Sequence, residues 1–282
     1  MKKVAVIQDL SSFGKCSLTA AIPVLSVMGV QACPLPTAIL SAQTGYPSFF
    51  YEDFTSRMAN FEEEWSKLNV TFDGISTGFV TGKEQIDNIF HFLDRFNNEK
   101  TFVLVDPVMG DEGEAYKLFT DELLVRMREL VKCADVITPN VTESCLLTGV
   151  SYETLHNYSN ESDYLKALEE VGNKLKQETK AKVIITGVNP PSKSEQFVGN
   201  LYLDGSKAIY SKIPFNGKSY SGTGDLFASV IMGSMVQGED LQKSVKLAEE
   251  FLLAAINDTY AGGTPEVEGV NFEKYLGMLL RK

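Results

Sequence analysis

A short segment rich in glycine has the composition of a phosphate-binding turn. Ser221, Gly222, Thr223, Gly224 and Asp225 follow one another and lead directly into an apolar stretch of helical period. The first turn of a helix presents unpaired N–H groups at the positive end of the helix dipole, and glycines let these groups converge on an anion. We therefore predict that the backbone amides of residues 222–225, here called the anion cup, hold a phosphate group without the help of a lysine.

Asp225 stands inside this turn, where a carboxylate can accept the proton of an attacking hydroxyl group. Phosphoryl transfer to an alcohol requires such a base. We therefore predict that Asp225 is the general base of a phosphoryl transfer. The alternative is structural: Asp225 only stabilises the first helical turn, and the glycines only make the entry to the helix flexible.

A second group of candidate residues consists of carboxylates near the ends of apolar runs. Asp106 and Asp111 flank the loop of the segment DPVMGD and can hold Mg²⁺, directly or through water, beside the phosphates of a substrate. Glu143 lies one turn into the helix predicted after Thr138-Pro139-Asn140. It either completes this acidic cluster or serves only as a favourable charge near a helix start. Taken alone, the loop carboxylates also fit a solvated surface loop.

Two other segments resemble phosphate-binding loops but lack a required glycine. Gly14-Lys15 and Gly217-Lys218-Ser219 look like the end of a GxxxxGK[ST] loop, yet Asp9 and Lys212 stand where the first glycine belongs. No GxGxxG motif follows a predicted strand. The two commonest nucleotide-binding motifs of α/β proteins are therefore unsupported, and a hydride-transfer enzyme is disfavoured with them.

The histidines and cysteines argue against two further kinds of site. His91 and His156 are the only histidines and lie in different stretches, the second among polar loop residues, so a Ser-His-Asp triad and a His-rich zinc site are disfavoured. The cysteines are unevenly spaced and contain no CxxC pair, which favours reduced, buried thiols. They are Cys16, Cys33, Cys133 and Cys145.

The elements that must position these residues alternate between short β-branched runs and longer stretches of helical period, which is typical of a parallel sheet with crossover helices. The predicted strands are Lys3–Gln8, Val30–Pro36, Gly74–Thr77, Phe102–Asp106, Val136–Thr138 and Val183–Thr186. The predicted helices between them are Lys15–Met28, Phe54–Leu68, Lys83–Asn97, Asp121–Cys133, Thr142–Thr148 and Ser162–Thr179.

After Thr186 the pattern changes. A turn signal at residues 189–192 precedes two β-rich runs, Phe197–Leu203 and Lys207–Ile213, which we predict to pair in antiparallel fashion. Three predicted helices follow, at Thr223–Val236, Asp240–Asp258 and Asn271–Leu280. Because no repeat, low-complexity segment or linker interrupts residues 1–282, we predict one three-layer α/β domain, with ligands bound beyond the carboxyl ends of the strands.

The overall charge restricts the partners. Twenty-six basic and 37 acidic residues leave a formal net charge of −11, which opposes binding to nucleic acid or to an anionic membrane surface. An anionic substrate such as a nucleotide then needs backbone amides or a metal cation. The amino-terminal apolar run is too short for a signal peptide, and no run of about 18 apolar residues occurs. We therefore expect a cytoplasmic protein.

Taken in order along the chain, these motifs resemble those of the ribokinase-like superfamily, in particular its pyridoxal (vitamin B6) kinase branch. The matching segments are the opening VAVIQDLSSFGKCSL, TGY at 44–46, STGF at 76–79, DPVMGD at 106–111, TPN at 138–140 with Glu143, IIT at 184–186 and GTGDLF at 222–227. The TGY segment favours the pyridoxal kinases. The fold implied is a three-layer ribokinase-like fold with a mostly parallel central sheet flanked by helices.

The resemblance implies ATP-dependent phosphorylation of the 5′-hydroxymethyl group of pyridoxal, pyridoxamine or pyridoxine. Asp225 would be the base, and the amides of residues 222–224 would stabilise the transferring phosphoryl group. Mg²⁺, and also a monovalent cation such as K⁺, would be organised by Asp106, Asp111 and Glu143. The implied ATP-binding residues are Asn140, Thr186, Lys218, Gly222 and Gly224, although Lys218 also fits a simply exposed side chain.

The pyridine ring would lie near Asp9, Thr44, Tyr46 and Phe79, where hydrogen bonds and an aromatic wall suit a flat polar heterocycle. Many similar pyridoxal kinases carry Ser in place of Asp9 and Tyr in place of Phe79. The QD opening instead resembles hydroxymethylpyrimidine kinases of thiamine synthesis, so that substrate is the alternative. For Tyr46 and Phe79, plain core packing is the structural alternative.

Three further expectations concern the oligomeric state, a mobile segment and a non-enzymatic function. Similar kinases are often homodimers, so a homodimer is expected. The segment Ala42–Asp53, rich in aromatic and turn residues, is a candidate mobile cover over the ring pocket. A vitamin or nucleotide sensor that has kept the fold is the non-enzymatic alternative, and the presence of Asp225 argues against it because a pure binder needs no base.

Overall fold

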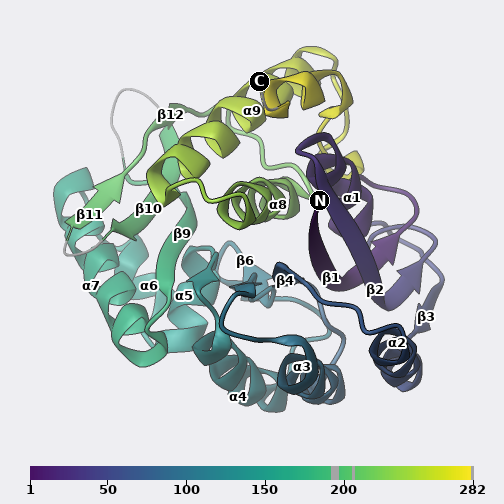
Figure 1. The fold of residues 1–282 in the computed structure, drawn as a ribbon. Helices are drawn as coiled ribbons and strands as arrows, with labels where there is room; N and C mark the ends of the chain where they lie inside the picture. Colours follow the sequence, from purple (N-terminus) through teal and green to yellow (C-terminus); the bar gives the residue numbers. More distant parts are fainter. Residues whose placement is uncertain (192–196, 205–206, 281–282) are drawn as a thin grey trace. The chain divides into compact units, whose positions relative to one another are not determined.

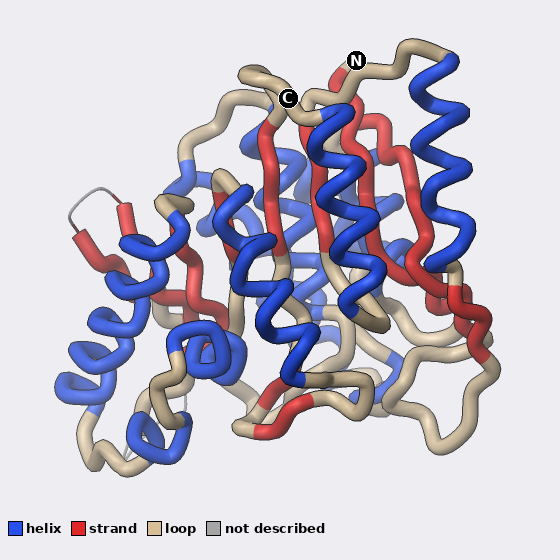
Figure 2. The backbone as a smooth tube through the Cα atoms, turned by 90° about the horizontal axis from the view of Figure 1, so that it is seen from below, coloured by secondary structure: helices blue, strands red, loops and turns tan. Residues whose placement is uncertain are grey.

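The computed structural model describes residues 1–191, 197–204 and 207–280. The chain divides into two compact units. Unit 1 comprises Met1–Leu104 and Lys218–Lys282, and unit 2 comprises Val105–Gly217. Strands alternate with helices along most of the chain (Figure 2), and helices flank a mostly parallel central sheet, which confirms the predicted α/β class.

Unit 1 contains the amino-terminal βα repeats and the carboxyl-terminal helices (Figure 1). Its strands are β1 (Lys2–Ser11), β2 (Val30–Leu40), β3 (Tyr51–Asp53), β4 (Gly74–Thr77) and β5 (Phe102–Val105), the last residue of β5 belonging to unit 2. Its α-helices are α1 (Ser17–Val27), α2 (Thr55–Lys67), α3 (Lys83–Phe96), α8 (Thr223–Val236) and α9 (Leu241–Ala261), followed by the 3₁₀ helices η2 (Glu266–Glu268) and η3 (Glu273–Leu279).

The strands of unit 1 stand in the order β5-β4-β1-β2-β3. Strand β1 pairs in parallel with both β2 and β4, and its apolar residues 4–7 are buried, as a continuous apolar run in a doubly covered sheet requires. Helix α8 packs against α1 and α9 and brings the anion cup to this unit. The predictions of strand Gly74–Thr77 and helix Thr223–Val236 are confirmed to the residue.

A shift of register interrupts the pairing of β1 with β2 at Asp9. Gln8 is opposite Pro36 and Leu10 is opposite Ile39, so β2 carries one extra residue at this point. A bulge bends the strand and redirects side chains, and bulges often occur next to functional sites. The irregularity lies near the carboxyl end of β1, at Asp9, which is a candidate ligand-binding residue.

Unit 2 contains the acidic loop and the antiparallel edge. Its strands are β6 (Gly110–Asp111), β7 (Glu114–Ala115), β8 (Val136–Ile137), β9 (Lys182–Val188), β10 (Phe197–Asp204), β11 (Lys207–Tyr210) and β12 (Ile213–Pro214). Its helices are α4 (Asp121–Leu130), the 3₁₀ helix η1 (Val131–Cys133), α5 (Val141–Thr148), α6 (Tyr152–His156) and α7 (Glu161–Thr179). Strand β8 is parallel to β9, and β10 is antiparallel to β11, as predicted. Strand β10 is also antiparallel to β9, a pairing that was not predicted.

Several predicted elements differ in detail. The run Lys207–Ile213 is divided into β11 and β12, because Ser211 bonds to both main-chain groups of Asn200 at a register shift of β10. Residues 271–280 form a 3₁₀ helix over Glu273–Leu279, in which Gly277 weakens α-helical propensity. The short strands β3, β6 and β7 were not predicted, since two or three residues give no periodic signal.

The histidine and cysteine predictions need two corrections. His156 does not lie in a loop: it ends the short helix α6, where its ring stacks on Tyr152 with centroids 5.2 Å apart. The four cysteines are free thiols, but only Cys16 and Cys145 are buried, whereas Cys133 is exposed on η1. Among the described residues, no helix combines the length and the apolarity needed to cross a membrane.

Candidate active site

The anion cup begins at Gly222, the residue that caps the amino terminus of α8. Gly222 has a φ angle of 79°, and no side chain caps this helix. The main chain of Gly222 accepts a hydrogen bond from the Leu226 N–H at 3.0 Å, which closes the first helical turn. Asp225 is the only acidic residue in that turn and is partly exposed. The predicted geometry of a helix amino terminus carrying one carboxylate is therefore present.

Segments from both ends of unit 1 hold this turn in place. A Cβ atom at Gly222 would overlap the carbonyl oxygen of Lys15, so these two backbones are in direct contact. The Ser221 N–H donates to the Glu266 carbonyl at 3.1 Å, and the Lys15 N–H donates to the Glu268 carbonyl at 3.1 Å. The anion cup is thus fixed between the start of α1 and the segment that contains η2.

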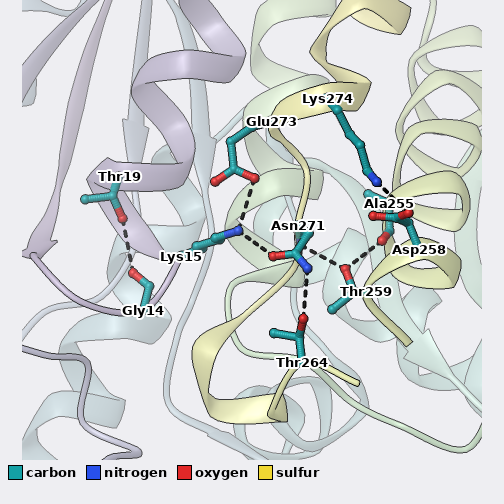
Figure 3. A network of polar contacts seen from close by, with 10 residues as sticks. All are labelled: Gly14, Lys15, Thr19, Ala255, Asp258, Thr259, Thr264, Asn271, Glu273 and Lys274. Carbon is teal, nitrogen blue, oxygen red and sulfur yellow. Dashed lines mark hydrogen bonds and ion pairs between the residues drawn. The ribbon is translucent and has the colours of Figure 1, made fainter. Parts of the chain in front are cut away.

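A polar network anchors the carboxyl-terminal segment to the same place (Figure 3). The Lys15 ammonium donates to Asn271 Oδ1 at 2.6 Å and contacts Glu273 Oε2 at 3.1 Å. The Asn271 N–H donates to Thr259 Oγ1 at 2.8 Å, and the Asn271 amide donates to Thr264 Oγ1 at 2.8 Å. Because Thr259 belongs to α9, these contacts connect α9 with the residues that precede α1.

Asp9 lies at the register shift of β1, with its side chain buried and both carboxylate oxygens hydrogen-bonded. Ser17 Oγ donates to Oδ1 at 2.5 Å, and Ser11 Oγ donates to Oδ2 at 2.7 Å. Burial raises the pKa of Asp9, and the two serine hydroxyls lower it only in part. Ser17 itself has a φ angle of 50°, an uncommon conformation for a residue with a side chain.

The structure brings Asp9 and Asp225 into one electrostatic neighbourhood around Cys16. Burial raises the pKa of the Cys16 thiol, and the negative charges of Asp225 and then Asp9 raise it further. The thiol is therefore protonated at neutral pH and is a poor nucleophile. The electrostatic coupling of both carboxylates to one side chain places the candidate base near a candidate ring-binding residue.

Tyr46 lies within electrostatic range of the same thiol. Burial raises the pKa of its hydroxyl, and the negative charge of Glu268 raises it further. Its ring packs on Phe13 with centroids 5.4 Å apart. Among the described residues, the buried hydroxyls of Tyr46 and Thr77 have no hydrogen-bond partner. Because buried polar groups are nearly always satisfied in folded proteins, a water or ligand group is expected at both.

The other two predicted ring contacts are less enclosed. Thr44 is exposed, and Phe79 is half-buried with its carbonyl accepting a hydrogen bond from Thr37 Oγ1 at 2.9 Å. Lys218 has a side chain that is 41% exposed, with Nζ 3.8 Å from Glu266 Oε1. The side chain of Lys218 therefore fits the alternative in which it is simply exposed.

In unit 2, Glu143 and Asn140 form a reciprocal cap at the start of α5. Asn140 Oδ1 accepts from the Glu143 N–H at 2.8 Å, and Glu143 Oε2 accepts from the Asn140 N–H at 2.8 Å. The other Glu143 oxygen accepts from the Met109 N–H at 3.1 Å, and the Asn140 amide donates to the Gly110 carbonyl at 2.7 Å. The last two contacts hold the loop of residues 106–111 against the start of α5.

Asp106 and Glu143 are buried close together, which is costly for two negative charges. Burial raises the pKa of Asp106, although Thr138 Oγ1 donates to its Oδ1 at 3.0 Å. Burial also raises the pKa of Glu143, and the charge of Asp106 raises it further. A bound cation would favour the ionised form of both groups, so the donor set fits a hard metal ion such as Mg²⁺.

Asp111 differs from the two buried carboxylates. It is exposed, and its Oδ1 accepts from the Glu112 N–H at 2.9 Å. Within the described part of the chain, no three His, Cys, Asp or Glu side chains gather as a ready metal cage. Mg²⁺ commonly keeps several waters and takes only one or two carboxylates together with substrate phosphates, so such a cage is not required.

Thr186 reaches the same region of unit 2 through its backbone. Its N–H donates to the Pro139 carbonyl at 2.9 Å, and it forms an isolated parallel bridge with Asn140. Unit 1 thus brings together Asp9, Tyr46 and Asp225, and unit 2 brings together Asp106, Asn140, Glu143 and Thr186. Sequence reasoning missed Ser11 at the end of β1, Gln43 after β2 and Ser17 at the start of α1, which are polar residues with no motif to distinguish them.

Comparisons with known proteins give consistent matches. Residues 12–269 match the family model described as phosphomethylpyrimidine kinase. A Bacteroides thetaiotaomicron protein, provisionally assigned as a phosphomethylpyrimidine kinase and crystallised with pyridoxal, is 38% identical, with a TM-score of 0.89 over 99% of this chain and 95% of that chain. Pyridoxal kinase from Lactobacillus plantarum is 30% identical, with a TM-score of 0.87 over 99% of this chain and 97% of that chain.

A curated relative represents the thiamine side of the family. The hydroxymethylpyrimidine/phosphomethylpyrimidine kinase of Bacillus subtilis is 29% identical over 194 residues, which cover 68% of this chain and 66% of that protein. Both kinds of small-alcohol kinase are therefore found among the relatives.

Proposed function

Because this chain belongs to the phosphomethylpyrimidine kinase family, we propose that it is an ATP-dependent kinase that phosphorylates the 5′-hydroxymethyl group of pyridoxal, pyridoxamine or pyridoxine. The observation that carries the proposal is the geometry of unit 1, where the backbone contact between Gly222 and Lys15 brings the start of α8, with Asp225, to the start of α1, where Ser17 bonds to the buried Asp9. The pyridoxal in the crystals of the Bacteroides thetaiotaomicron relative supports a B6 vitamer as the acceptor.

In the proposed reaction, Asp225 accepts the proton of the 5′-hydroxyl group while the hydroxyl oxygen attacks the γ-phosphorus of ATP. The bond between the γ-phosphorus and the β,γ-bridging oxygen breaks, and ADP leaves. The amides of residues 222–224 bind the transferring phosphoryl group at the positive end of α8. Catalysis of this kind rests mainly on positioning and electrostatic stabilisation. A helix start that is fixed to two other segments of unit 1 is suited to such positioning.

Asp106, Asp111 and Glu143 would hold Mg²⁺, directly or through water. When bound, the ion supplies positive charge that neutralises phosphate oxygens. Asn140, Thr186 and Lys218 would bind ATP, and Lys218 would add a further positive charge despite its contact with Glu266. A monovalent cation such as K⁺ at the same carboxylates is part of the proposal.

At the acceptor, Asp9 and Tyr46 would bind the polar edge of the ring, and Thr44 and Phe79 would complete its surroundings. The unpartnered hydroxyl of Tyr46 supports this role, because a ring substituent would satisfy it. We further propose a single functional domain, a homodimer and a cytoplasmic location. The exposed Phe50 and Tyr51, at the edge formed by β3, are candidates for the dimer contact.

Hydroxymethylpyrimidine phosphorylation is the second candidate function. Asp9, the family model and the Bacillus subtilis relative favour it. The reaction and the base would be the same, since this substrate also presents a hydroxymethyl group on a flat heterocycle. Only the ring contacts would differ.

The test is ADP release from Mg-ATP with pyridoxal, pyridoxamine, pyridoxine and hydroxymethylpyrimidine compared in parallel, with Asp225→Ala as the blank. We expect turnover of a B6 vitamer that is lost in the variant. Activity on the pyrimidine alone would assign the protein to thiamine metabolism, and activity on none of the four would reject both candidates.

A further inference from the structure

Gln43 is a buried glutamine whose side chain contacts three segments of unit 1. It is 8% exposed. Its Oε1 accepts from the Gly45 N–H at 2.7 Å, and its Nε2 donates to Ser221 Oγ at 3.2 Å and to the Val267 carbonyl at 3.0 Å. The side-chain amide is thus engaged at both ends, by an acceptor contact within its own turn and by donor contacts to residues far along the chain.

The space around this side chain is closely fitted. A Cβ atom at Gly14 would lie 2.7 Å from Gln43 Cγ, and one at Gly45 would lie 2.8 Å from Gln43 Nε2. The Gln43 N–H also donates to the Phe13 carbonyl at 2.9 Å. The Gln43 side chain therefore occupies space that any side chain at residue 14 or residue 45 would fill. The hydrogen bond to Phe13 also holds the backbone of Gln43 in place.

The segments joined by Gln43 are those that the proposed reaction must bring together. Residues 44–46 form the turn assigned to the ring of the acceptor, and its last member, Tyr46, donates its N–H to the Gln43 carbonyl at 3.2 Å. Ser221 directly precedes the anion cup, and Val267 lies in η2, whose Glu266 carbonyl accepts the Ser221 N–H. No motif in the sequence distinguishes Gln43 from the other glutamines.

We propose, on the basis of the proposed function, that Gln43 is a positioning residue that sets the spacing between the acceptor turn and the anion cup. Phosphoryl transfer depends on the distance and direction between hydroxyl and phosphate, and a displacement of about 1 Å can lower the rate by about 10²-fold. The amide fixes the turn through Gly45 and fixes the cup through Ser221, without itself touching the reacting atoms.

The two ends of the amide predict separable effects. Gln43→Met removes both kinds of contact at similar volume. Gln43→Glu keeps an acceptor for the Gly45 N–H but turns a second acceptor toward the Val267 carbonyl, so the donor contact with Val267 is lost even though the Ser221 hydroxyl can reverse its bond. The contact with Gly45 should therefore govern the KM for the acceptor, and the donor contacts with Ser221 and Val267 should govern kcat.

The control variant is Thr101→Val. Thr101 is 7% exposed and donates to the Phe72 carbonyl at 3.1 Å, so its substitution also removes a buried hydrogen bond at constant shape. It directly precedes β5, at the amino end of that strand, whereas the candidate site follows the carboxyl ends of strands. A general loss of stability should appear in this variant, whereas a loss of positioning should not.

Steady-state kinetics with the B6 vitamer that the wild-type protein phosphorylates would test the proposal. We expect Gln43→Met to lower kcat by about 10- to 100-fold, to raise the KM for the acceptor and to leave the KM for ATP within about twofold. Gln43→Glu should lower kcat to a similar extent with an acceptor KM near that of the wild type. Thr101→Val should retain the kcat and KM values of the wild type.

Amide hydrogen exchange separates this inference from the proposed function. In Gln43→Met, peptides covering residues 41–47 and 218–224 should exchange faster than in the wild type, whereas Thr101→Val should leave them unchanged. Unaltered exchange, or kinetic constants of Gln43→Met like those of Thr101→Val, would overturn the positioning role. A wild-type protein inactive on every acceptor would reject the proposed function, while the exchange measurement would still test the link made by Gln43.

Discussion

Gly222 and Lys15 approach so closely that no side chain fits between them. A Cβ atom added to Gly222 would overlap the carbonyl oxygen of Lys15, and the φ angle of 79° at Gly222 is one that residues with side chains rarely adopt. Lys15 is followed by Cys16, the residue on which the charges of Asp9 and Asp225 converge. This contact therefore sets where the anion cup lies relative to the end of β1.

Gly222→Ala should reduce both stability and activity, because the new methyl group meets backbone rather than a flexible side chain. The strained φ angle alone costs on the order of 1 kcal/mol, and the overlap adds to it. We expect a lower free energy of unfolding in urea and a loss of kcat larger than the loss of folded protein.

Two other glycines separate these causes. Gly29 has a φ angle of 76° but would place a Cβ atom in open space, so Gly29→Ala measures the conformational cost without the overlap. Gly277 has neither a positive φ angle nor a neighbour within 4 Å, so Gly277→Ala should be nearly neutral. Equal destabilisation by Gly222→Ala and Gly29→Ala would show that the contact with Lys15 is unimportant.

Asp225→Ala should lower kcat by about 10²- to 10⁴-fold, the usual contribution of a general base. Folding and ATP binding should be nearly unchanged, because Asp225 is partly exposed at the helix start. The measurements are steady-state kinetics, urea unfolding and ATP titration by calorimetry. Asp225→Asn, which keeps the shape and removes the basicity, should be as inactive as the alanine variant. Full activity in either variant, or unfolding of both, would contradict the assignment of the base.

Asp111→Asn should raise the Mg²⁺ concentration needed for half-maximal activity several-fold, because it removes a negative charge proposed to order the ion. The matched control is Glu112→Gln, which neutralises the adjacent exposed carboxylate. A Mg²⁺ titration of both variants at saturating ATP measures the effect. Titration curves for Asp111→Asn that coincide with those of Glu112→Gln would remove Asp111 from the metal site.

Asp9 should make the stability of the protein depend on pH. Its pKa is raised above the ordinary value of 3.8 by burial, so the folded protein binds this proton more tightly than the unfolded chain does. The stability that this group contributes is fully present below about pH 3.8 and is lost as the pH rises through its folded pKa. The free energy of unfolding of Asp9→Asn, measured in urea, should therefore gain on the wild type as the pH rises.

Asp73 should make the stability of the protein depend on pH in the opposite direction. Partial burial would raise its pKa, but the hydrogen bonds from Lys2 and from the Lys3 N–H lower it below 3.8. Its contribution is present above the unfolded pKa and is lost as the pH falls through the folded one. Asp73→Asn should thus lose stability relative to the wild type as the pH rises. A shift of the same sign in both variants would mean that Asp9 is not held as described.

The sequence alone was sufficient for elements whose local signals agree. The strand at residues 74–77 and the helix at residues 223–236 were predicted to the residue. The strand starts at a glycine and contains β-branched residues, and the helix joins an apolar run to a glycine before its first residue. The sequence also singled out Asp225 and the carboxylates of residues 106–143 as candidates, since anion binding and metal binding require particular residue types in order along the chain; their roles stay predictions. Three-residue strands and the exposure of Cys133 carry no such local signal.

The tertiary structure decided the relationships between distant residues. Asp9 and Asp225 lie more than two hundred positions apart in the printed sequence, and only the packing of α8 against α1 places both near Cys16. The same holds for Gln43, which is an ordinary glutamine until Ser221 and Val267 meet its amide. The sequence specifies which chemical groups are available, whereas burial and close backbone contact, which depend on the whole fold, determine their pKa values and their partners.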